Sequence, residues 1–402
     1  LCWPGKGDLA LSPRVSQADL CLQERWRTPD DQAPGKDPLP GTLIQGDNLR
    51  ILASLLSDYR GSLDLIYIDP PFCTGDHFYR GRDPGDPGEG ARHKAYSDHW
   101  SGGMAGYLNM MAPRLILMRQ LLSQRGSLLV HVDQRASSHL RLVLDEIFGA
   151  DARVNEIAWC YGGGGAPRRS YPRKHDTLLW YARGREWIFN RQYRPYSEGT
   201  LKRGLTAVKG DRYKLRPEGA GLDDWWTGPE VQKILSPTAR ENLKYPTQKP
   251  EGLLRRILTG HSHPDSLIGD FFCGSGTTLA VAGALGRRWI GCDAGALAVQ
   301  TCRKRLADAG QPFDLLVESG FAARGGPLAQ GYHVTLQEDR LSLVPPPQQA
   351  GPDFWAVDWA HDGEVFEGAC CHRAQRKRPA PLEVPVPAGV DPEFVRVLVV
   401  DA

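Results

Sequence analysis

The chain has 402 residues, of which 41% are hydrophobic and 24% charged, and its formal net charge is +2. This length supports one sizeable α/β core with smaller attached lobes. The sequence has no run of about 18 apolar residues and no charged-then-apolar leader, so we expect neither a membrane span nor a secretion signal. Nine cysteines without a CxxC pair fit neither a disulfide framework nor a zinc site, and they favour a reducing cytoplasm.

The first third of the chain ends in a long loop. Residues 1–42 are punctuated by Pro and Gly, which predicts an irregular arm. A helix is expected over 48–57 and a buried strand over 63–68, where the sequence LDLIYI stops abruptly at Asp69-Pro70-Pro71. Residues 73–104 are rich in Gly, Pro, Asp and His, and so long a loop is usually functional or disordered. We expect a functional loop.

Helical and strand patterns alternate through most of the remaining chain. Helices are predicted over 107–124, 137–148, 277–285 and 296–309 and from Pro250 onward, and strands over 127–132, 157–161, 177–181, 187–189, 266–271 and 289–292. This alternation predicts an α/β fold with a doubly wound, mainly parallel sheet. Residues 190–244 lose the periodicity. The tail, 320–402, has strand-like pieces at 331–336 and 394–400 and is expected to form a small appended lobe.

A glycine turn carries the first chemical signal. In the run Asp270-Phe271-Phe272-Cys273-Gly274-Ser275-Gly276-Thr277-Thr278 the glycines let a ligand approach the backbone at the start of a helix. The third glycine of the dinucleotide fingerprint is absent, so phosphate binding is not indicated. Asp293 ends the next strand and suits the two hydroxyls of a ribose. Ribose without pyrophosphate suggests S-adenosylmethionine, whereas a purely structural turn is the competing interpretation.

The turn Asp69-Pro70-Pro71-Phe72 carries the second signal. The lone pair of an aromatic amino group is delocalised into its ring, so the nitrogen attacks a sulfonium methyl poorly. The Asp69 carboxylate and the Pro70 carbonyl can each accept one N–H and direct that lone pair to the methyl. Pro71 stiffens the turn, and Phe72 can stack on a base taken out of a duplex. Alone, this run also fits an ordinary solvated Pro-Pro turn.

Together these motifs resemble the amino-group DNA methyltransferases of the permuted β arrangement, most closely the modification subunits of type III restriction systems. The likeness covers about residues 43–310 and also includes Gly46-Asp47-Asn48 and Tyr245-Pro246-Thr247-Gln248-Lys249-Pro250. It implies a circularly permuted, seven-stranded, Rossmann-like methyltransferase sheet. A catalytic half (43–189) and a cofactor half (245–312) would flank a target-recognition insert (190–244).

The resemblance also implies roles for single residues. The glycine turn, including Phe272, Gly274, Ser275, Gly276 and Thr277, would hold the methionine part of the cofactor, and Asp293 would hold the ribose. Thr247 and Lys249 would lie near the cofactor carboxylate, and Asp47 and Asn48 would border its adenine. The family usually has Pro where Phe271 stands and Asn where Cys73 stands, although neither change removes a group that the chemistry needs.

A basic middle segment suggests the substrate. Residues 153–216 contain fifteen Lys and Arg and five Asp and Glu, a net charge near +10, so the remainder carries about −8. Aromatic residues are interleaved with these charges, as on surfaces that bind phosphates and stack bases. They are Tyr161, Tyr171, Trp180, Tyr181, Trp187, Tyr193, Tyr196 and Tyr213. Beside a base-methylation turn, contact with double-stranded DNA is a better interpretation than a merely solvated basic face.

Asp rather than Ser at position 69 favours N6 of adenine, and the alternative is N4 of cytosine. A catalytically silent DNA-binding subunit and an RNA or small-molecule methyltransferase are weaker alternatives. The histidines show no metal-ligand spacing, and the chemistry needs no metal. Without a GxxxxGK[ST] loop or a nuclease constellation, restriction would require a separate subunit. A homodimer is left open.

Overall fold

The computed structural model describes residues 1–8, 12–27, 40–79, 94–163, 165, 167–204, 215–234, 236, 239, 241–321, 333–336, 340–344, 354–358, 365–368, 370–373, 383–386 and 395–400. Within them, eleven strands form one sheet in the order β11-β7-β8-β6-β3-β12-β13-β2-β14-β1-β18. These strands are β1 (Leu20–Trp26), β2 (Gly41–Gln45), β3 (Leu63–Ile68), β6 (Leu122–Val132), β7 (Arg153–Cys160), β8 (His175–Ala182), β11 (Trp225–Trp226), β12 (Leu267–Asp270), β13 (Arg288–Asp293), β14 (Phe313–Glu318) and β18 (Phe366–Gly368).

The strand directions confirm a mainly parallel sheet. In the seven consecutive strands β7-β8-β6-β3-β12-β13-β2, β8 runs antiparallel to both of its neighbours and the others run parallel to one another. The expected count of seven strands is nevertheless wrong for the sheet as a whole. The two-residue strand β11 extends one edge, and β14, β1 and β18 extend the other.

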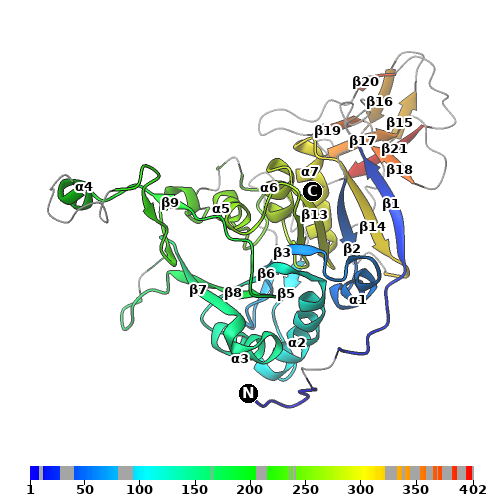
Figure 1. The fold of residues 1–402 in the computed structure, drawn as a ribbon. Coiled ribbons are helices and arrows are strands. Elements are labelled where there is room, and N and C mark those ends of the chain that lie inside the picture. Colours follow the sequence, from blue (N-terminus) through cyan, green and yellow to red (C-terminus); the bar gives the residue numbers. More distant parts are fainter. Residues whose placement is uncertain are drawn as a thin grey trace.

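Helices cover both faces of this sheet (Figure 1). One layer consists of α1 (Asn48–Tyr59), α2 (Met104–Leu121) and α3 (Ser137–Phe148), and the other of α5 (Glu251–His261), α6 (Thr277–Ala284) and α7 (Ala296–Asp308). Successive residues of β3 serve the two layers in turn: Ile66 and Ile68 pack in the core of α1, α2 and α3, whereas Leu65 and Tyr67 pack in that of α5, α6 and α7. Because both faces are covered, every residue of β3 is buried.

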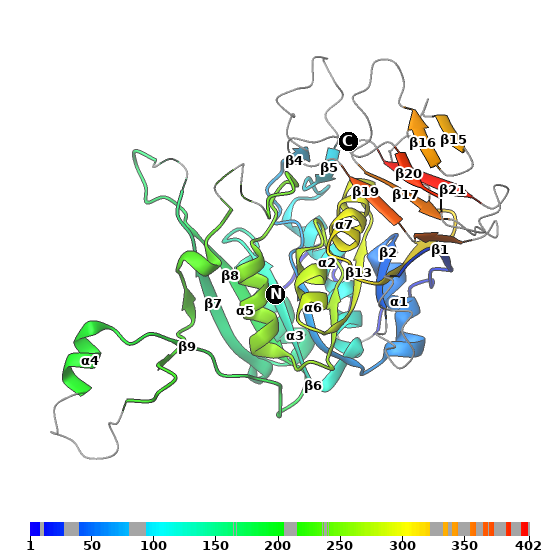
Figure 2. The same cartoon turned by 90° about the horizontal axis from the view of Figure 1, so that it is seen from above.

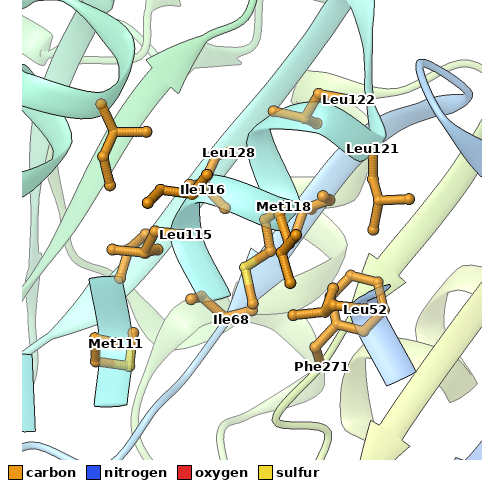
Figure 3. Close-up of a cluster of buried hydrophobic side chains, with 14 of the residues drawn as sticks. Leu52, Ile68, Met111, Leu115, Ile116, Met118, Leu121, Leu122, Leu128 and Phe271 are labelled. Atoms are coloured by element: carbon orange, nitrogen blue, oxygen red, sulfur yellow. The ribbon is translucent and has the colours of Figure 1, made fainter. Parts of the chain in front are cut away.

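The first of these cores is continuous beneath the strands (Figure 3). Leu52 of α1 lies near Phe271, while Met111, Leu115 and Met118 of α2 fill the space between that helix and the sheet. Pro113 lies inside α2 without ending it. We predicted that this helix would continue to residue 124, but it ends at Leu121 and the long strand β6 begins at the next residue.

The N-terminal arm departs from our expectation of an irregular segment. Residues 20–26 form β1, which pairs antiparallel with β14. Its side chains alternate between the two faces, but the inward series includes Glu24, which bonds to Trp26 Nε1 and pairs with Arg303. Because the charged Glu24 occupies an inward position, the alternation of apolar and polar residues that predicts a strand is interrupted in the sequence. The strand β14 was also unforeseen, since it occupies the gap between the predicted cofactor half and tail.

A third expectation, a strand over 187–189, is wrong. These residues have no regular structure, and Trp187 and Phe189 pack around Trp180 and His261 instead. Their apolar character therefore reflects an aromatic cluster and not strand pairing. Strand β8 pairs antiparallel with β7 and with β6 instead.

Smaller elements lie outside the main sheet. They are the pair β4 (His77–Tyr79) and β5 (Lys94–Ser97), the pair β9 (Tyr193–Arg194) and β10 (Ala220–Gly221), α4 (Glu198–Gly204), and the short 3-10 turns Ala150–Ala152 and Pro229–Val231. The segment with β9 and α4 projects far from the body of the molecule (Figures 1 and 2).

The C-terminal strands form two three-stranded sheets of their own. One contains β15 (His333–Leu336), β16 (Arg340–Val344) and β20 (Glu383–Pro385), and the other β17 (Phe354–Asp358), β19 (Cys370–Arg373) and β21 (Arg396–Val400). Leu341, Trp355 and Val384 contribute to a small separate core. Strand β18 leaves this lobe to pair with β1, so the lobe extends the main sheet. No helix among the described residues is long and apolar enough to cross a membrane.

Candidate active site

A pocket lies where three neighbouring strands of the sheet end. Asp69 directly follows β3, while Asp270 and Asp293 are the last residues of β12 and β13. Although β3 and β12 are about 200 residues apart in the chain, they pair in parallel, so these carboxylates meet at one sheet edge. The cavity is lined by Tyr67, Asp69, Pro71, Tyr96, Tyr245, Pro246, Thr247, Gln248, Lys249, Leu254, Asp270, Phe272, Cys273, Gly274, Ser275, Thr277, Thr278 and Asp293.

Most of the residues that the sequence singled out therefore lie around one cavity. Pro70 is buried beside it, Phe72 follows in the same turn, and Gly276 begins α6 between two lining residues. Asp47 and Asn48 are the exceptions, since they neither line this pocket nor adjoin a lining residue in the chain. Asp47 caps α1 by accepting from Leu49 N–H at 2.9 Å.

The side chain of Arg114 explains the position of both residues. Its guanidinium donates to Asp47 Oδ1 at 2.9 Å and to Asn48 Oδ1 at 2.5 Å. Asn48 Nδ2 in turn donates to the Phe271 carbonyl at 2.7 Å. These contacts anchor the start of α1 to the back of the glycine turn.

Asp69 is held by an ion pair. Lys249 Nζ lies 2.5 Å from Asp69 Oδ2 and also sits 5.2 Å from the centroid of the Phe72 ring. The other carboxylate oxygen, Oδ1, is buried and accepts no hydrogen bond from any described residue. A buried acceptor without a donor is costly, so this atom is poised to receive an N–H from a ligand. Sequence reasoning placed Lys249 near a cofactor carboxylate and missed its contact with Asp69.

The turn after Asp69 is anchored by a second carboxylate, Asp98. Its two oxygens accept from the backbone N–H groups of Phe72, Cys73 and Thr74 at 2.8–3.0 Å. Trp100 Nε1 donates to it as well, at 3.0 Å. Asp98 is almost fully buried. It lies in the stretch expected to be a loop, and no local pattern distinguishes it there, so sequence reasoning missed it.

The glycine turn is arranged by hydrogen bonds between strand ends. Asp270 Oδ1 accepts from Phe272 N–H at 3.1 Å, and Asp293 Oδ2 accepts from Gly274 N–H at 2.9 Å. Gly276 has φ +73°, and a Cβ there would come within 2.7 Å of Cys302 Sγ. Only glycine therefore fits between the turn and α7 without rearrangement.

Burial raises the pKa of the carboxyl groups in the pocket. For Asp270, burial raises the pKa to about 7, against the opposing hydrogen bonds from Thr278 and Phe272 N–H. Burial raises the pKa of Asp293 as well, and backbone N–H donors again oppose the shift. With Asp69 they place three carboxyl groups against the single lining cation, Lys249, among the described residues. The pocket is thus suited to a ligand that carries positive charge.

Aromatic residues that the sequence did not single out complete the wall. Tyr96 of β5 contacts Thr247 Oγ1 through its hydroxyl at 3.2 Å, and Tyr245 packs beside Gly274. Thr247 has φ +61°, which a Thr rarely adopts. The only sequence signal for Tyr245 was its place at the start of the Tyr245 to Pro250 run.

The basic middle segment divides into core and surface residues. Trp180 and Tyr181 are buried strand residues, so they do not belong to an interaction surface. Tyr171, by contrast, is 95% exposed in the connection between β7 and β8, next to Arg168, Arg169, Arg173 and Lys174. Tyr193 and Trp187 are partly exposed, and Tyr213 lies outside the described residues.

The fold and the pocket define a doubly wound α/β protein whose pocket lies at the carboxyl ends of parallel strands, where such folds bind ligands. The DNA methylase family matches residues 63–304, which is more than half of the chain and includes every residue that lines the pocket. The chain belongs to this family.

Curated relatives agree with this assignment. The chain is 28% identical over 328 residues to the type II methyltransferase M.EcaI of Enterobacter cloacae, covering 67% of this chain and 70% of that protein. It is 26% identical over 255 residues to the EcoP15I Mod subunit of Escherichia coli, a type III restriction-modification protein, covering 60% of this chain and 37% of that subunit. It is 25% identical over 274 residues to the DNA adenine methyltransferase YhdJ of Escherichia coli K12, covering 66% and 82%.

Solved structures show the same kind of similarity at lower identity. The M1.HpyAVI–SAM complex superposes with a TM-score of 0.44 at 19% identity and covers 66% of this chain and 98% of that one. The PvuII DNA methyltransferase, described as cytosine-N4-specific, has a TM-score of 0.44 at 16% identity and covers 72% and 95%.

Proposed function

We propose that this protein transfers a methyl group from S-adenosylmethionine to N6 of an adenine that has been turned out of double-stranded DNA. The observation that carries this proposal is the buried Oδ1 of Asp69, which has no donor among the described residues, at the edge of a pocket with a glycine turn. An exocyclic amino group would supply the missing donor.

The residues present fit the proposed cofactor. S-adenosylmethionine supplies an electrophilic methyl on a sulfonium, and it brings a positive charge that suits the carboxyl groups of the pocket. The positive φ of Gly274 and Gly276 brings the backbone close to the cavity. We propose that Phe272, Gly274, Ser275, Gly276 and Thr277 hold its methionine part and Asp293 its ribose. In the same proposal Thr247 and Asp270 border the cofactor, and Asp47 and Asn48 support its site from behind.

The catalytic turn would activate the amino group. Asp69 Oδ1 accepts one N–H, and the Pro70 carbonyl accepts the other, so the nitrogen lone pair turns toward the methyl. The two acceptors also stabilise the positive charge that develops on nitrogen. Lys249 holds the other oxygen of Asp69 and thereby fixes the direction of Oδ1. Pro71 stiffens the turn, and Phe72 offers its ring to the extruded base.

Double-stranded DNA would contact the basic segment. Residues 153–216 carry a net charge near +10, and four cationic residues lie within three positions of the exposed Tyr171 in the sequence. We place target recognition in 190–244, of which the part with β9 and α4 projects from the body (Figure 1). The named relatives further support adenine as the target base and a modification role in a restriction system, for which a separate restriction subunit would be the partner.

The test is methyl transfer itself. Purified protein should transfer labelled methyl from S-adenosylmethionine to duplex DNA, and nucleoside analysis should give N6-methyladenine. Asp69→Ala should lower transfer by at least about 10²-fold while cofactor affinity stays near that of the wild type. Full activity of this variant would contradict the assigned mechanism, and N4-methylcytosine in the product would overturn the choice of base. Sequencing of methylated host DNA would identify the target site.

A further inference from the structure

A row of buried polar side chains runs from the catalytic strand toward the basic segment. The Tyr67 hydroxyl lies 2.9 Å from His131 Nδ1, and His131 Nε2 lies 3.2 Å from Asp176 Oδ2. The Tyr161 hydroxyl donates to Asp176 Oδ1 at 2.9 Å. These residues belong to, or directly follow, the four adjacent strands β3, β6, β8 and β7.

The chemistry of the row assigns the protons. Burial opposes the ionisation of Asp176, but its hydrogen bonds with His131 and Tyr161 lower its pKa, so Asp176 is an ionised acceptor. His131 Nε2 then donates to Asp176, and Nδ1 accepts from the Tyr67 hydroxyl. Every hydrogen-bonding atom of the His131 ring is thereby satisfied. A fully satisfied buried network holds its members in one orientation.

The ring of His131 also packs against the ring of Phe72 in the catalytic turn. The two rings are nearly parallel, with 6.1 Å between centroids and an interplanar angle of 22°. Trp159 closes the other side of the imidazole edge-on at 5.3 Å, and its own Nε1 donates to the Val231 carbonyl. His131 is fully buried and is not a lining residue of the pocket.

We propose that His131, oriented by Asp176, is a positioning residue for the target base: it sets the ring of Phe72 on which that base stacks. This inference rests on the proposed function. The imidazole cannot rotate without breaking its bonds to Tyr67 and Asp176, so the Phe72 ring has a fixed support when the base arrives. Positioning errors of about 1 Å lower catalytic rates by about 10²-fold, which makes such a support valuable.

The outer end of the row reaches the surface that would meet DNA. Tyr161 N–H donates to the Lys174 carbonyl at 2.9 Å and so closes the connection that carries Tyr171. Lys233 Nζ lies 5.0 Å from the centroid of the Tyr161 ring. Together with the contact between His131 and Phe72, these hydrogen bonds therefore link the Phe72 ring to the start of the cationic connection between β7 and β8.

Two variants separate the ring from its orientation. His131→Gln keeps a donor for Asp176 and removes the ring, whereas Asp176→Asn keeps the ring and changes the hydrogen bonds that orient it. Both should lower kcat by about 10-fold to 10²-fold. Their affinities for S-adenosylmethionine and for DNA should stay within about threefold of the wild type, since neither residue contacts the cofactor pocket or the phosphates.

The specific readout is the fluorescence of 2-aminopurine at the target position of a duplex that carries the identified site. Wild type should change this fluorescence by extruding and stacking the base, and the variants should give a different stacked signal at full DNA occupancy. Tyr181→Phe is the matched control, because it removes a buried hydroxyl that donates to Asp145 at 2.6 Å away from the turn. It should lower stability and leave kcat and the fluorescence unchanged.

The outcomes are distinct. If the wild type methylates no DNA, the proposed function fails and this inference falls with it. If the wild type is active and both variants keep its kcat and its fluorescence signal, the positioning role alone is wrong. If kcat in the variants falls only in proportion to cofactor binding and folded fraction, as a merely structural residue would cause, the inference is overturned as well.

Discussion

At the scale of single residues, Asp270 has an ionisation state that depends on what occupies the pocket. It is 2% exposed, and burial raises its pKa to about 7, far above the usual value for a carboxyl group. In the free protein this group therefore binds a proton that the unfolded chain releases near pH 4. Between about pH 4 and pH 7 the folded state holds more protons, so this carboxyl group costs stability progressively as the pH rises through that window.

A positively charged cofactor should reverse that preference. Its charge favours the carboxylate, so binding at pH 6 should release a proton and affinity should rise as the pH increases from about 6 to 8. Calorimetry in buffers of different ionisation enthalpy would measure the released proton. Asp270→Asn should remove this pH dependence, whereas Asp133→Asn, which changes another carboxyl group of raised pKa outside the pocket, should retain it. PH-independent cofactor affinity in the wild type would contradict the assignment.

The sequence could identify residues whose chemistry is local. Asp69, Gly274 and Asp293 stand in short runs with a recognisable geometry, and all three line the pocket. It could not reveal the Lys249 to Asp69 contact, because that contact joins side chains 180 positions apart. Cys73 stands where the resembling family usually has Asn, and only the structure shows why Asn suits this position. This residue has φ +59°, a region that Asn tolerates better than Cys, so the Asn usual in the resembling family fits the backbone.

At the scale of elements, the turn after β3 depends on Asp98. Asp98→Asn should lower the free energy of unfolding by about 1.5–3 kcal/mol, because hydrogen bonds to a buried charged acceptor are replaced by weaker ones. It should also lower kcat by at least tenfold, since the backbone of Phe72 to Thr74 loses its anchor. Chemical denaturation and single-turnover transfer would measure the two effects.

Thr74→Val provides the control for this element. It removes the hydroxyl that donates to Asp98 at 2.8 Å and leaves the three backbone donors in place. Its loss of kcat should be several times smaller than that of Asp98→Asn. Equal losses in both variants would mean that the side-chain contact, and not the anchored backbone, maintains the turn.

Elements were predictable where hydrophobic periodicity and burial agree. The bounds of β3 and α3 match the predicted ranges, because one is apolar at every position except Asp64 and the other has a clear helical stripe. The strand β1 was missed because Glu24 occupies an inward position, where its charge is satisfied by Arg303 on a distant helix. The strand over 187–189 was wrongly expected because apolar residues also form clusters without strand pairing.

At the scale of the whole molecule, the resemblance implied a circularly permuted sheet, and the strands β3 and β12, far apart in the chain, do pair in parallel. The additional strands at the sheet edges could not be foreseen, since β1 and β18 come from opposite ends of the chain. Long-range pairing of this kind leaves no mark on local sequence.

Charge is distributed unevenly over the whole molecule, and this distribution predicts how DNA binding should depend on salt. Residues 153–216 carry a net charge near +10, and the rest of the chain carries about −8. If six to ten of these cations contact phosphates, DNA affinity should fall by about 10³–10⁵-fold between 50 and 200 mM salt. Replacing both Arg168 and Arg169, beside the exposed Tyr171, with Ala should reduce the slope of log affinity against log salt by about 2. Arg340→Ala on the C-terminal lobe should leave it unchanged. Equal slopes for both variants, measured by fluorescence anisotropy, would place the DNA on another surface.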